Sequence, residues 1–235
     1  MLKKQSIDFE YHFKTHDGRE FDYHVHMNPD TGEVIDPQMS GPDWTRLGHY
    51  QCDHCPLKAS DVAYCPLAAQ ISHAVEFFSK TPSYDQLSLT ITSKRRKMSV
   101  ACDAQDGIRS LMGLIMAVSG CPKTTLLRPM ARFHLPLSDL EETRYRVTSM
   151  FMLAQYFIHT AGKQADWNMD SLQEIYADLH TVNASMLSRI KHEITQDAPA
   201  NALVILDAFT VYMTESILFD LEDMRSIFAQ WVEQA

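Results

Sequence analysis

The sequence has 235 residues and a formal charge of −9, with 45% hydrophobic and 22% charged residues. This composition excludes a largely disordered chain, and the acidic charge argues against a general nucleic-acid-binding protein, which needs an electropositive surface. The length allows one large domain or two small ones, each with its own hydrophobic core.

The compartment can be inferred from the N-terminus, the apolar runs and the cysteines. The basic start of the sequence is not followed by an apolar segment, so no secretory signal peptide is predicted. The most apolar runs, residues 111–118 and 147–157, are shorter than the roughly 20 residues that span a bilayer. Five cysteines without a signal peptide fit a reducing compartment. We therefore expect a cytoplasmic protein that does not bind membranes.

Two pairs of short segments have the alternating polar and apolar pattern of half-buried β-strands. The first pair flanks Asp17-Gly18, a turn sequence typical of β-hairpins, and a helical pattern begins at Pro66 between the two pairs. The expected order is ββαββ, which predicts an antiparallel four-stranded sheet with helix on one face. The four segments are residues 7–14 with 21–27, and residues 87–93 with 97–102.

The sequence becomes helical from about Asp106 onward. Residues 107–119 are apolar on all sides, which predicts a buried central helix capped by Gly120. Cys121 is expected to begin the next helix, which Pro129 should kink or end.

Later helix starts are predicted from capping residues and proline. Ser138 with Glu141, and Ser171 with Glu174, match the capping-box pattern for helices that end near Thr160 and Gln196. Another helix is expected from Pro199, and a last one over residues 217–232. The fold class is therefore α+β. We expect residues 1–104 to hold the sheet and a cysteine-rich segment, and residues 105–235 to form an α-helical bundle.

Residues 49–67 contain three of the five cysteines and predict a metal site. Cys52 and Cys55 have the C-x2-C spacing that lets two thiolates bind one ion, and Cys65 follows closely. Cys121 is the best candidate for a fourth ligand because, like Cys55 and Cys65, it precedes proline. Proline favours the first position of a helix, which places the cysteine at the N-cap, where free N–H groups stabilise a thiolate. His49 or His54 could replace Cys121 if the metal is zinc.

The residue after each cysteine indicates which metal is bound. Zinc-binding turns favour a small residue after the second cysteine, whereas Cys-Pro is familiar at the last ligand of bacterial iron–sulfur runs. An iron–sulfur cluster is therefore the first expectation and structural zinc the alternative. The competing interpretation is that these cysteines are buried apolar side chains that never meet. Cys102 is in phase with Met98 and Val100 on a strand, so we expect it in the core.

A group of basic residues lies after Cys121 in the sequence. Arg128, Arg132 and His134 could hold a small anionic ligand beside the metal, with Arg144 and Arg146 nearby. The alternative is that these arginines form ordinary ion pairs with the acidic residues of the next helix. Those acidic residues are Asp139, Glu141 and Glu142.

Four stretches together resemble a bacterial protein family of unknown function, over nearly the whole chain. The resemblance implies a soluble bacterial protein and assigns no activity, cofactor or partner. The stretches are CDHCPL, YCPLA, SGCPKTTLLRPMARFHLPLSDLEETRYRV and NALVILDAF.

Three functions remain open from the sequence. The first is a cysteine-ligated metalloprotein with a redox, sensing or anion-binding role. The second is a thiol-redox enzyme that uses Cys52 and Cys55, with Cys65 as a reactive thiolate. The third is an interaction protein without chemistry, whose helical half exposes methionines to a protein partner. The expected partner is an unknown protein or a small anion, and neither nucleic acid nor membrane. The methionines are Met150, Met152, Met186 and Met213.

Overall fold

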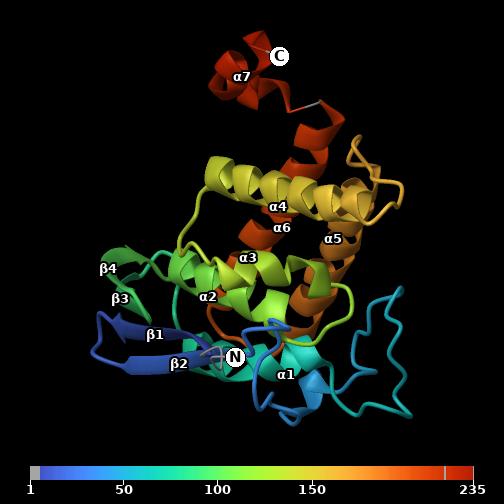
Figure 1. Cartoon of the computed structure of the whole chain (residues 1–235). Helices are drawn as coiled ribbons and strands as arrows, with labels where there is room; N and C mark the ends of the chain where they lie inside the picture. Colours follow the sequence, from blue (N-terminus) through green and yellow to red (C-terminus); the bar gives the residue numbers. More distant parts are fainter. Residues whose placement is uncertain (1–5, 220, 235) are drawn as a thin grey trace.

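The computed structural model describes residues 6–219 and 221–234. An antiparallel sheet and two helices form one part of the molecule, and longer helices stack beyond them (Figure 1). The sheet has the order β2-β1-β3-β4, so the predicted four-stranded antiparallel arrangement is confirmed. The strands are β1 (Ile7–Thr15), β2 (Glu20–Met27), β3 (Gln86–Ser93) and β4 (Arg96–Asp103).

The alternating pattern of β1 separates a buried face of the sheet from an exposed one. Phe9, Tyr11 and Phe13 are buried on the inner face. On the outer face each histidine of the first hairpin lies beside a carboxylate of the neighbouring strand, which makes this face a set of exposed ion pairs. The pairs are His12 with Asp22, His24 with Glu10 and His26 with Asp8.

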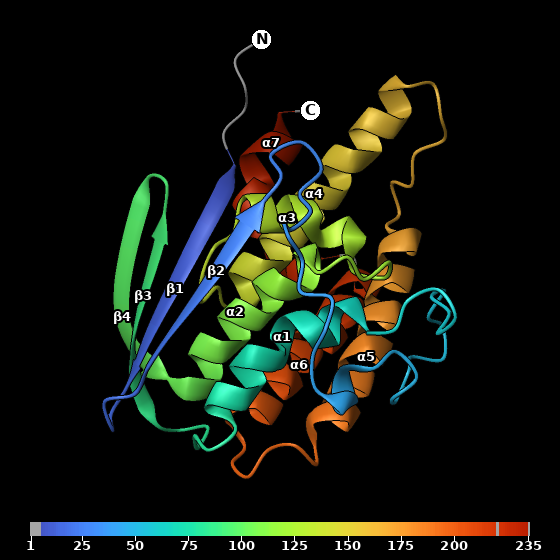
Figure 2. The ribbon, with the colours of Figure 1, turned by 90° about the horizontal axis from the view of Figure 1, so that it is seen from below.

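Two helices cover the inner face of the sheet (Figure 2). They are α1 (Pro66–Phe78) and α2 (Ala104–Val118), and nearly every residue of α2 is buried. Gly107 allows α2 to approach the sheet closely, because a Cβ atom at this position would lie 3.1 Å from the Phe13 ring. Gly120 has φ +85° just after α2, as its predicted capping role requires.

Three long helices complete the structure: α4 (Leu140–Thr160), α5 (Asp170–Ile190) and α6 (Ala198–Leu218). α5 packs against α6, and α6 packs against α2. Short helical segments connect or follow them. These are the 3-10 turns Asp43–Thr45, Thr125–Leu127 and Glu222–Phe228, and the helices α3 (Arg128–Arg132) and α7 (Ala229–Glu233).

Several predicted helix boundaries were wrong. No helix begins at Cys121: a turn follows it, and Pro129 lies in the first turn of α3 instead of ending a helix. The predicted last helix is also divided, because α6 ends at Leu218 and only short helical segments follow.

The predicted capping boxes were also misplaced. The box of α4 is formed by Asp139 with Glu142, one residue later than predicted. At α5 the capping group is the Asp166 carboxylate, which accepts hydrogen bonds from the backbone N–H groups of Asp170 and Ser171.

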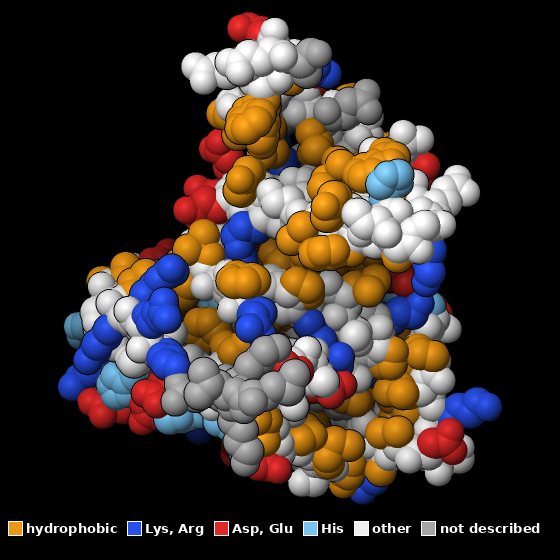
Figure 3. Space-filling model, in the orientation of Figure 1, with side chains coloured by type: hydrophobic (Ala, Val, Ile, Leu, Met, Phe, Trp, Pro, Cys, Tyr) orange, Lys and Arg blue, Asp and Glu red, His pale blue; other side chains and the backbone are white. Residues whose placement is uncertain are grey.

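The hydrophobic side chains form two cores. The larger core joins the sheet, α1 and α2 to the C-terminal half of α5 and the start of α6, so packing is continuous across the boundary expected at residue 104. The smaller core lies between α4, α5 and α6 and includes Val147, Leu179 and Met213. Apolar side chains such as Leu153 and Phe157 are exposed along α4 (Figure 3).

α6 is long and apolar enough to cross a membrane by length and composition. Its buried side includes Ala202 and Leu203 of the larger core, whereas Val204, Val211 and Leu218 are exposed. A core helix passes the same test, so this property does not by itself indicate a membrane span.

The tight contact at Gly107 predicts a difference between the two interior glycines of α2. Alanine normally stabilises a helix by about 1 kcal/mol relative to glycine, and Gly113→Ala should show this gain, because its nearest neighbour is Leu206 at an ordinary 3.5 Å. In Gly107→Ala the added Cβ would crowd the Phe13 ring and cancel this gain. This variant should therefore be less stable than Gly113→Ala by about 1–2 kcal/mol. Urea unfolding of both variants measures the difference, and equal stability would contradict the close approach.

Candidate functional site

The structure brings Cys52, Cys55, Cys65 and Cys121 into one neighbourhood. Cys65 and Cys121 are buried in the larger core, and Cys52 and Cys55 pack against it. Burial is the main cause of the raised pKa of Cys65 and of Cys121, and the charge of Cys52 adds to it at both, so Cys52 lies near these two buried thiols. Cys102 lies elsewhere, between the sheet and α2 near Gly107. All five cysteines are free thiols.

Backbone N–H groups point toward two of these sulfurs. Cys65 is the N-cap residue of α1, as predicted, and the N–H groups of Leu67 and Ala68 lower the pKa of its thiol. At Cys121 the N–H groups of Lys123 and Thr124 act in the same way, although a turn replaces the predicted helix. Burial outweighs these contributions: it raises the pKa of Cys65, and that of Cys121 to about 11. Both thiols are therefore protonated near neutral pH when no cation is bound.

A buried arginine lies beside the cysteines. The side chain of Arg189 on α5 is only 1% exposed, and its guanidinium donates hydrogen bonds to the carbonyl oxygens of Trp44 (3.0 Å), Arg46 (2.7 Å) and Leu47 (3.0 Å). Cys65, Cys52 and Cys55 raise its pKa, while burial lowers it. Within the described residues it forms no ion pair with a carboxylate, and its Nε has no hydrogen-bond partner. The positive charge therefore faces the thiols uncompensated.

The loop that carries Cys52 and Cys55 is closed at its base by two backbone hydrogen bonds between its two ends. The Leu47 N–H donates to the Ala63 carbonyl (3.0 Å), and the Cys65 N–H donates to the Thr45 carbonyl (2.8 Å). Within this loop the Cys55 N–H donates to the Cys52 carbonyl (3.0 Å), so the C-x2-C sequence forms a tight turn. The three carbonyl groups that accept from the buried arginine lie at the base of the same loop. The cysteine turn is therefore held at a fixed distance from α5.

The two candidate histidines differ in their surroundings. His54 Nε2 lies 3.1 Å from the Asp178 carbonyl oxygen and 3.3 Å from its carboxylate, while its Nδ1 is buried without a hydrogen-bond partner in the described part of the chain. Lys123 Nζ contacts the same carboxylate at 2.8 Å. His49 instead packs edge-on against Tyr50. His54 therefore has one buried ring nitrogen without a partner among the described residues.

No group of three or more His, Cys, Asp or Glu side chains in residues 6–219 and 221–234 has an arrangement that could hold a metal ion. The four thiols are thus neighbours without a formed coordination geometry.

The three basic residues predicted to bind an anion point in different directions. Arg128 pairs with Glu33 at 3.1 Å, and Arg132 donates a hydrogen bond to the Pro29 carbonyl. His134 turns inward and its Nε2 contacts the Tyr11 hydroxyl. Arg132 and His134 nevertheless line one surface pocket, which Arg128 does not line.

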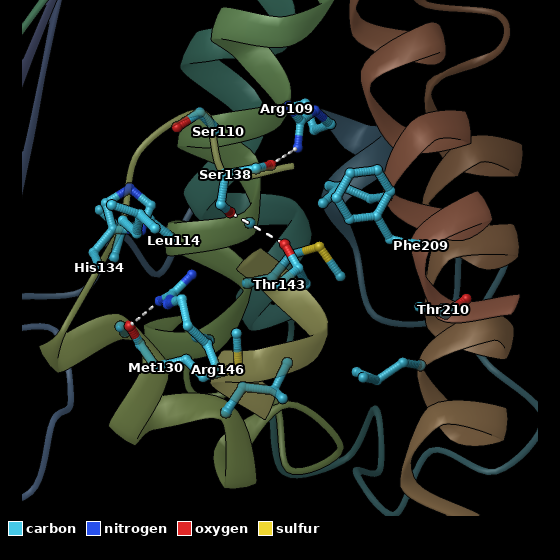
Figure 4. Close-up of a pocket in the computed structure, with 18 of the residues that line it drawn as sticks. Arg109, Ser110, Leu114, Met130, His134, Ser138, Thr143, Arg146, Phe209 and Thr210 are labelled. Atoms are coloured by element: carbon cyan, nitrogen blue, oxygen red, sulfur yellow. Dashed lines mark hydrogen bonds between the residues drawn. The ribbon is translucent and has the colours of Figure 1, made fainter. Parts of the chain in front are cut away.

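The two later arginines also reach different parts of the molecule. The Arg144 guanidinium donates to the Tyr212 hydroxyl (2.8 Å). Arg146 donates to the carbonyl oxygens of Met130 (3.0 Å) and Phe133 (3.2 Å). Arg146 and His134 line the same cavity (Figure 4).

Sequence reasoning missed Arg189, although one signal was available. The apolar stripe of α5 includes Val182 and Met186, and Arg189 follows at the next position of the same face, three residues on. A charged residue in phase with a buried stripe is rare unless it has partners, so this position could have been noticed. Its partners lie more than 140 residues away, and no local motif identifies them.

Comparison with known proteins gives one match. A family model described as Domain of unknown function (DUF6901) matches residues 7–229. No curated protein and no solved structure matches the chain.

The contacts of Arg189 predict a local loss of structure when it is replaced. Arg189→Met removes the donor from three buried carbonyl groups, so the free energy of unfolding should fall by about 2–5 kcal/mol, and residues 46–65 should become sensitive to protease. Arg46→Met is the matched control, because Arg46 is exposed and its side chain pairs with Asp43 and Tyr64 among the described residues. Urea unfolding and limited proteolysis of both variants test this, and an equal effect of the two would contradict it.

The buried ring of His134 predicts loss of stability in acid. Burial, followed by the charge of Arg146, lowers its pKa from 6.5 to about 3. Between these values the unfolded chain binds a proton that the folded chain does not, so stability is full above pH 6.5 and falls as the pH drops toward 3. From pH 7 to pH 5 the wild type should lose about 1–2 kcal/mol more than His134→Gln, after allowance for partial exposure. Urea unfolding at both pH values measures this, and parallel losses would refute it.

Proposed function

The chain belongs to the DUF6901 family, and we propose that it is a metalloprotein whose centre is held by Cys52, Cys55, Cys65 and Cys121. The observation that carries this proposal is the buried guanidinium of Arg189, which has no carboxylate partner among the described residues and lies beside the free thiols of Cys65, Cys52 and Cys55. Burying a guanidinium without a carboxylate is costly, and a negatively charged centre at the thiols would offset the cost. A metal or cluster held by four thiolates has such a charge.

The N–H groups at Cys65 and Cys121 support the same proposal. They stabilise the thiolate form, which is the form that binds a metal, although burial keeps the free thiols protonated. Metal binding should therefore release protons and become tighter as the pH rises. Because no coordination geometry is formed among the described residues, the Cys52 and Cys55 side chains must turn toward the two buried sulfurs. The closed loop keeps both of them near enough for this.

The bound group that we propose is an iron–sulfur cluster, with zinc as the alternative. Cys-Pro occurs at Cys55, Cys65 and Cys121 and favours the cluster. The unpartnered Nδ1 of His54 favours zinc, which binds three cysteines and one histidine readily. A cluster would supply one-electron chemistry for transfer or sensing, whereas zinc would stabilise the loop. Either group requires the reducing cytoplasm that we expect.

The other two candidate functions have less support. A thiol-redox enzyme would need a reactive thiolate, and the pKa of Cys65 is raised instead. The interaction hypothesis relied on exposed methionines, but Met186 and Met213 belong to the cores. Exposed apolar residues occur on several elements, among them Leu153, Tyr156 and Phe157 of α4, which could meet a protein partner.

Anaerobic purification followed by iron, sulfide and zinc analysis tests the proposal. The wild type should contain iron and sulfide and show a broad visible charge-transfer band; stoichiometric zinc in a colourless sample would identify the alternative. Cys55→Ser and Cys121→Ser should each lose most of the metal.

Cys102→Ser is the matched control, because Cys102 is a partly buried cysteine outside the cluster of four and should keep the metal. Retention of metal by Cys121→Ser with loss in His54→Ala would make His54 the fourth ligand. A wild type that contains no metal, and takes up neither zinc nor iron with sulfide, would refute the proposal.

A further inference from the structure

A second candidate site lies in the helical half, away from the cysteines. It is a cavity of about 140 Å³, partly open to solvent, that is lined by residues of α2, α3, α4, α5 and α6. Arg146 and His134 lie on one side of it, and Phe209 and Thr210 of α6 lie on the opposite side (Figure 4). None of the five cysteines lines the cavity, so it is separate from the proposed metal centre.

The cavity contains a buried amide without partners. The side chain of Asn183 on α5 lines the cavity and is only 2% exposed, yet neither its Nδ2 nor its Oδ1 has a hydrogen-bond partner in the described residues. Buried polar groups almost always have partners, since an unpaired one loses its hydration without compensation. Asn183 thus presents both a donor and an acceptor to whatever occupies the cavity.

The cavity also contains an arginine whose charge is not matched by a close carboxylate. Arg146 donates to two carbonyl oxygens and forms no ion pair within the described residues. The acidic residue that affects its pKa is Glu142, whose carboxylate accepts a hydrogen bond from the Asp139 N–H at the start of α4. Arg109, the other arginine of the lining, lies 3.4 Å from Asp106. The unmatched positive charge favours an anionic ligand.

The rest of the lining limits the size and chemistry of that ligand. Leu114, Leu206 and Phe209 are among the many apolar residues around the cavity. A cavity of about 150 Å³ holds a molecule the size of benzene, so roughly five to seven non-hydrogen atoms fit here. An apolar wall disfavours inorganic phosphate, which needs hydrogen bonds on all sides.

We propose that this cavity binds a short-chain monocarboxylate. Its carboxylate accepts hydrogen bonds from Arg146 and Asn183, and its hydrocarbon part packs against Leu114, Leu206 and Phe209.

Binding of isobutyrate tests this, with isobutyramide as an uncharged ligand of the same shape. NMR titration of the purified protein should show saturable binding of isobutyrate with a Kd of about 1 mM or lower. Isobutyramide should bind at least about tenfold more weakly, because it lacks the charge that Arg146 meets. Inorganic phosphate should not displace isobutyrate.

Three variants separate a binding role from a structural one. Asn183→Leu keeps the number and branching of the side-chain heavy atoms and removes the unpaired amide, so the protein should be as stable as the wild type or more stable, while isobutyrate binding weakens at least about tenfold. Arg146→Met should abolish the preference for isobutyrate over isobutyramide. Arg132→Met, an arginine outside the cavity, should bind like the wild type.

Two results would overturn the proposal. One is the absence of any saturable shift in the wild type at about 20 mM isobutyrate, which would mean that the cavity holds only water. The other is unchanged isobutyrate binding in Asn183→Leu, which would place the binding site elsewhere.

Discussion

The arrangement of the cysteine-rich half depends on one buried guanidinium. Arg189 projects from α5 and donates to three carbonyl groups of an irregular segment that has little regular structure of its own. These hydrogen bonds position the base of the loop that carries Cys52 and Cys55. The same cation lies beside Cys65, at the N-terminus of α1. The carbonyl groups satisfy donors of its guanidinium, whereas no carboxylate among the described residues balances its charge.

Helix α5 also explains why the two proposed sites can be independent. Residues of an α-helix are separated by about 100° around its axis, so Tyr176 and Asn183 lie on one face, and Asp178 and Arg189 lie on a nearly opposite one. The first face lines the cavity. The second contacts His54 through Asp178 and the loop base through Arg189. A ligand on one face therefore need not disturb the contacts on the other.

The sequence predicted those features that depend on local patterns. The alternation of polar and apolar residues predicted the strands and their buried face. The Cys65-Pro66 pair predicted that Cys65 is the N-cap of α1. The capping error at α4 arose because Ser138 and Asp139 each precede a glutamate by three residues, and only tertiary packing selects the second pair. The grouping of Cys52, Cys55, Cys65 and Cys121 around one metal stays a prediction from their spacing and their Cys-Pro pairs, and no local pattern pointed to Arg189 beside Cys65. Arg128, Arg132 and His134 are close in sequence, yet the turns of α3 and the segment after it direct them to separate neighbours.

The unpartnered buried atoms of the described residues differ in what they imply. The Nε of Arg109 and of Arg128 lacks a hydrogen bond, but Nη1 of Arg109 donates to the Ser138 carbonyl and Nη2 of Arg128 pairs with Glu33, so each guanidinium still has a partner. The Nε of Arg189 also lacks a hydrogen bond, but the larger cost at Arg189 is a buried positive charge without a carboxylate partner among the described residues. Asn183 is the extreme case, because its donor and its acceptor are both unpaired in a buried position. An apolar side chain at this position would not carry that cost, and a polar ligand in contact with the amide would offset it.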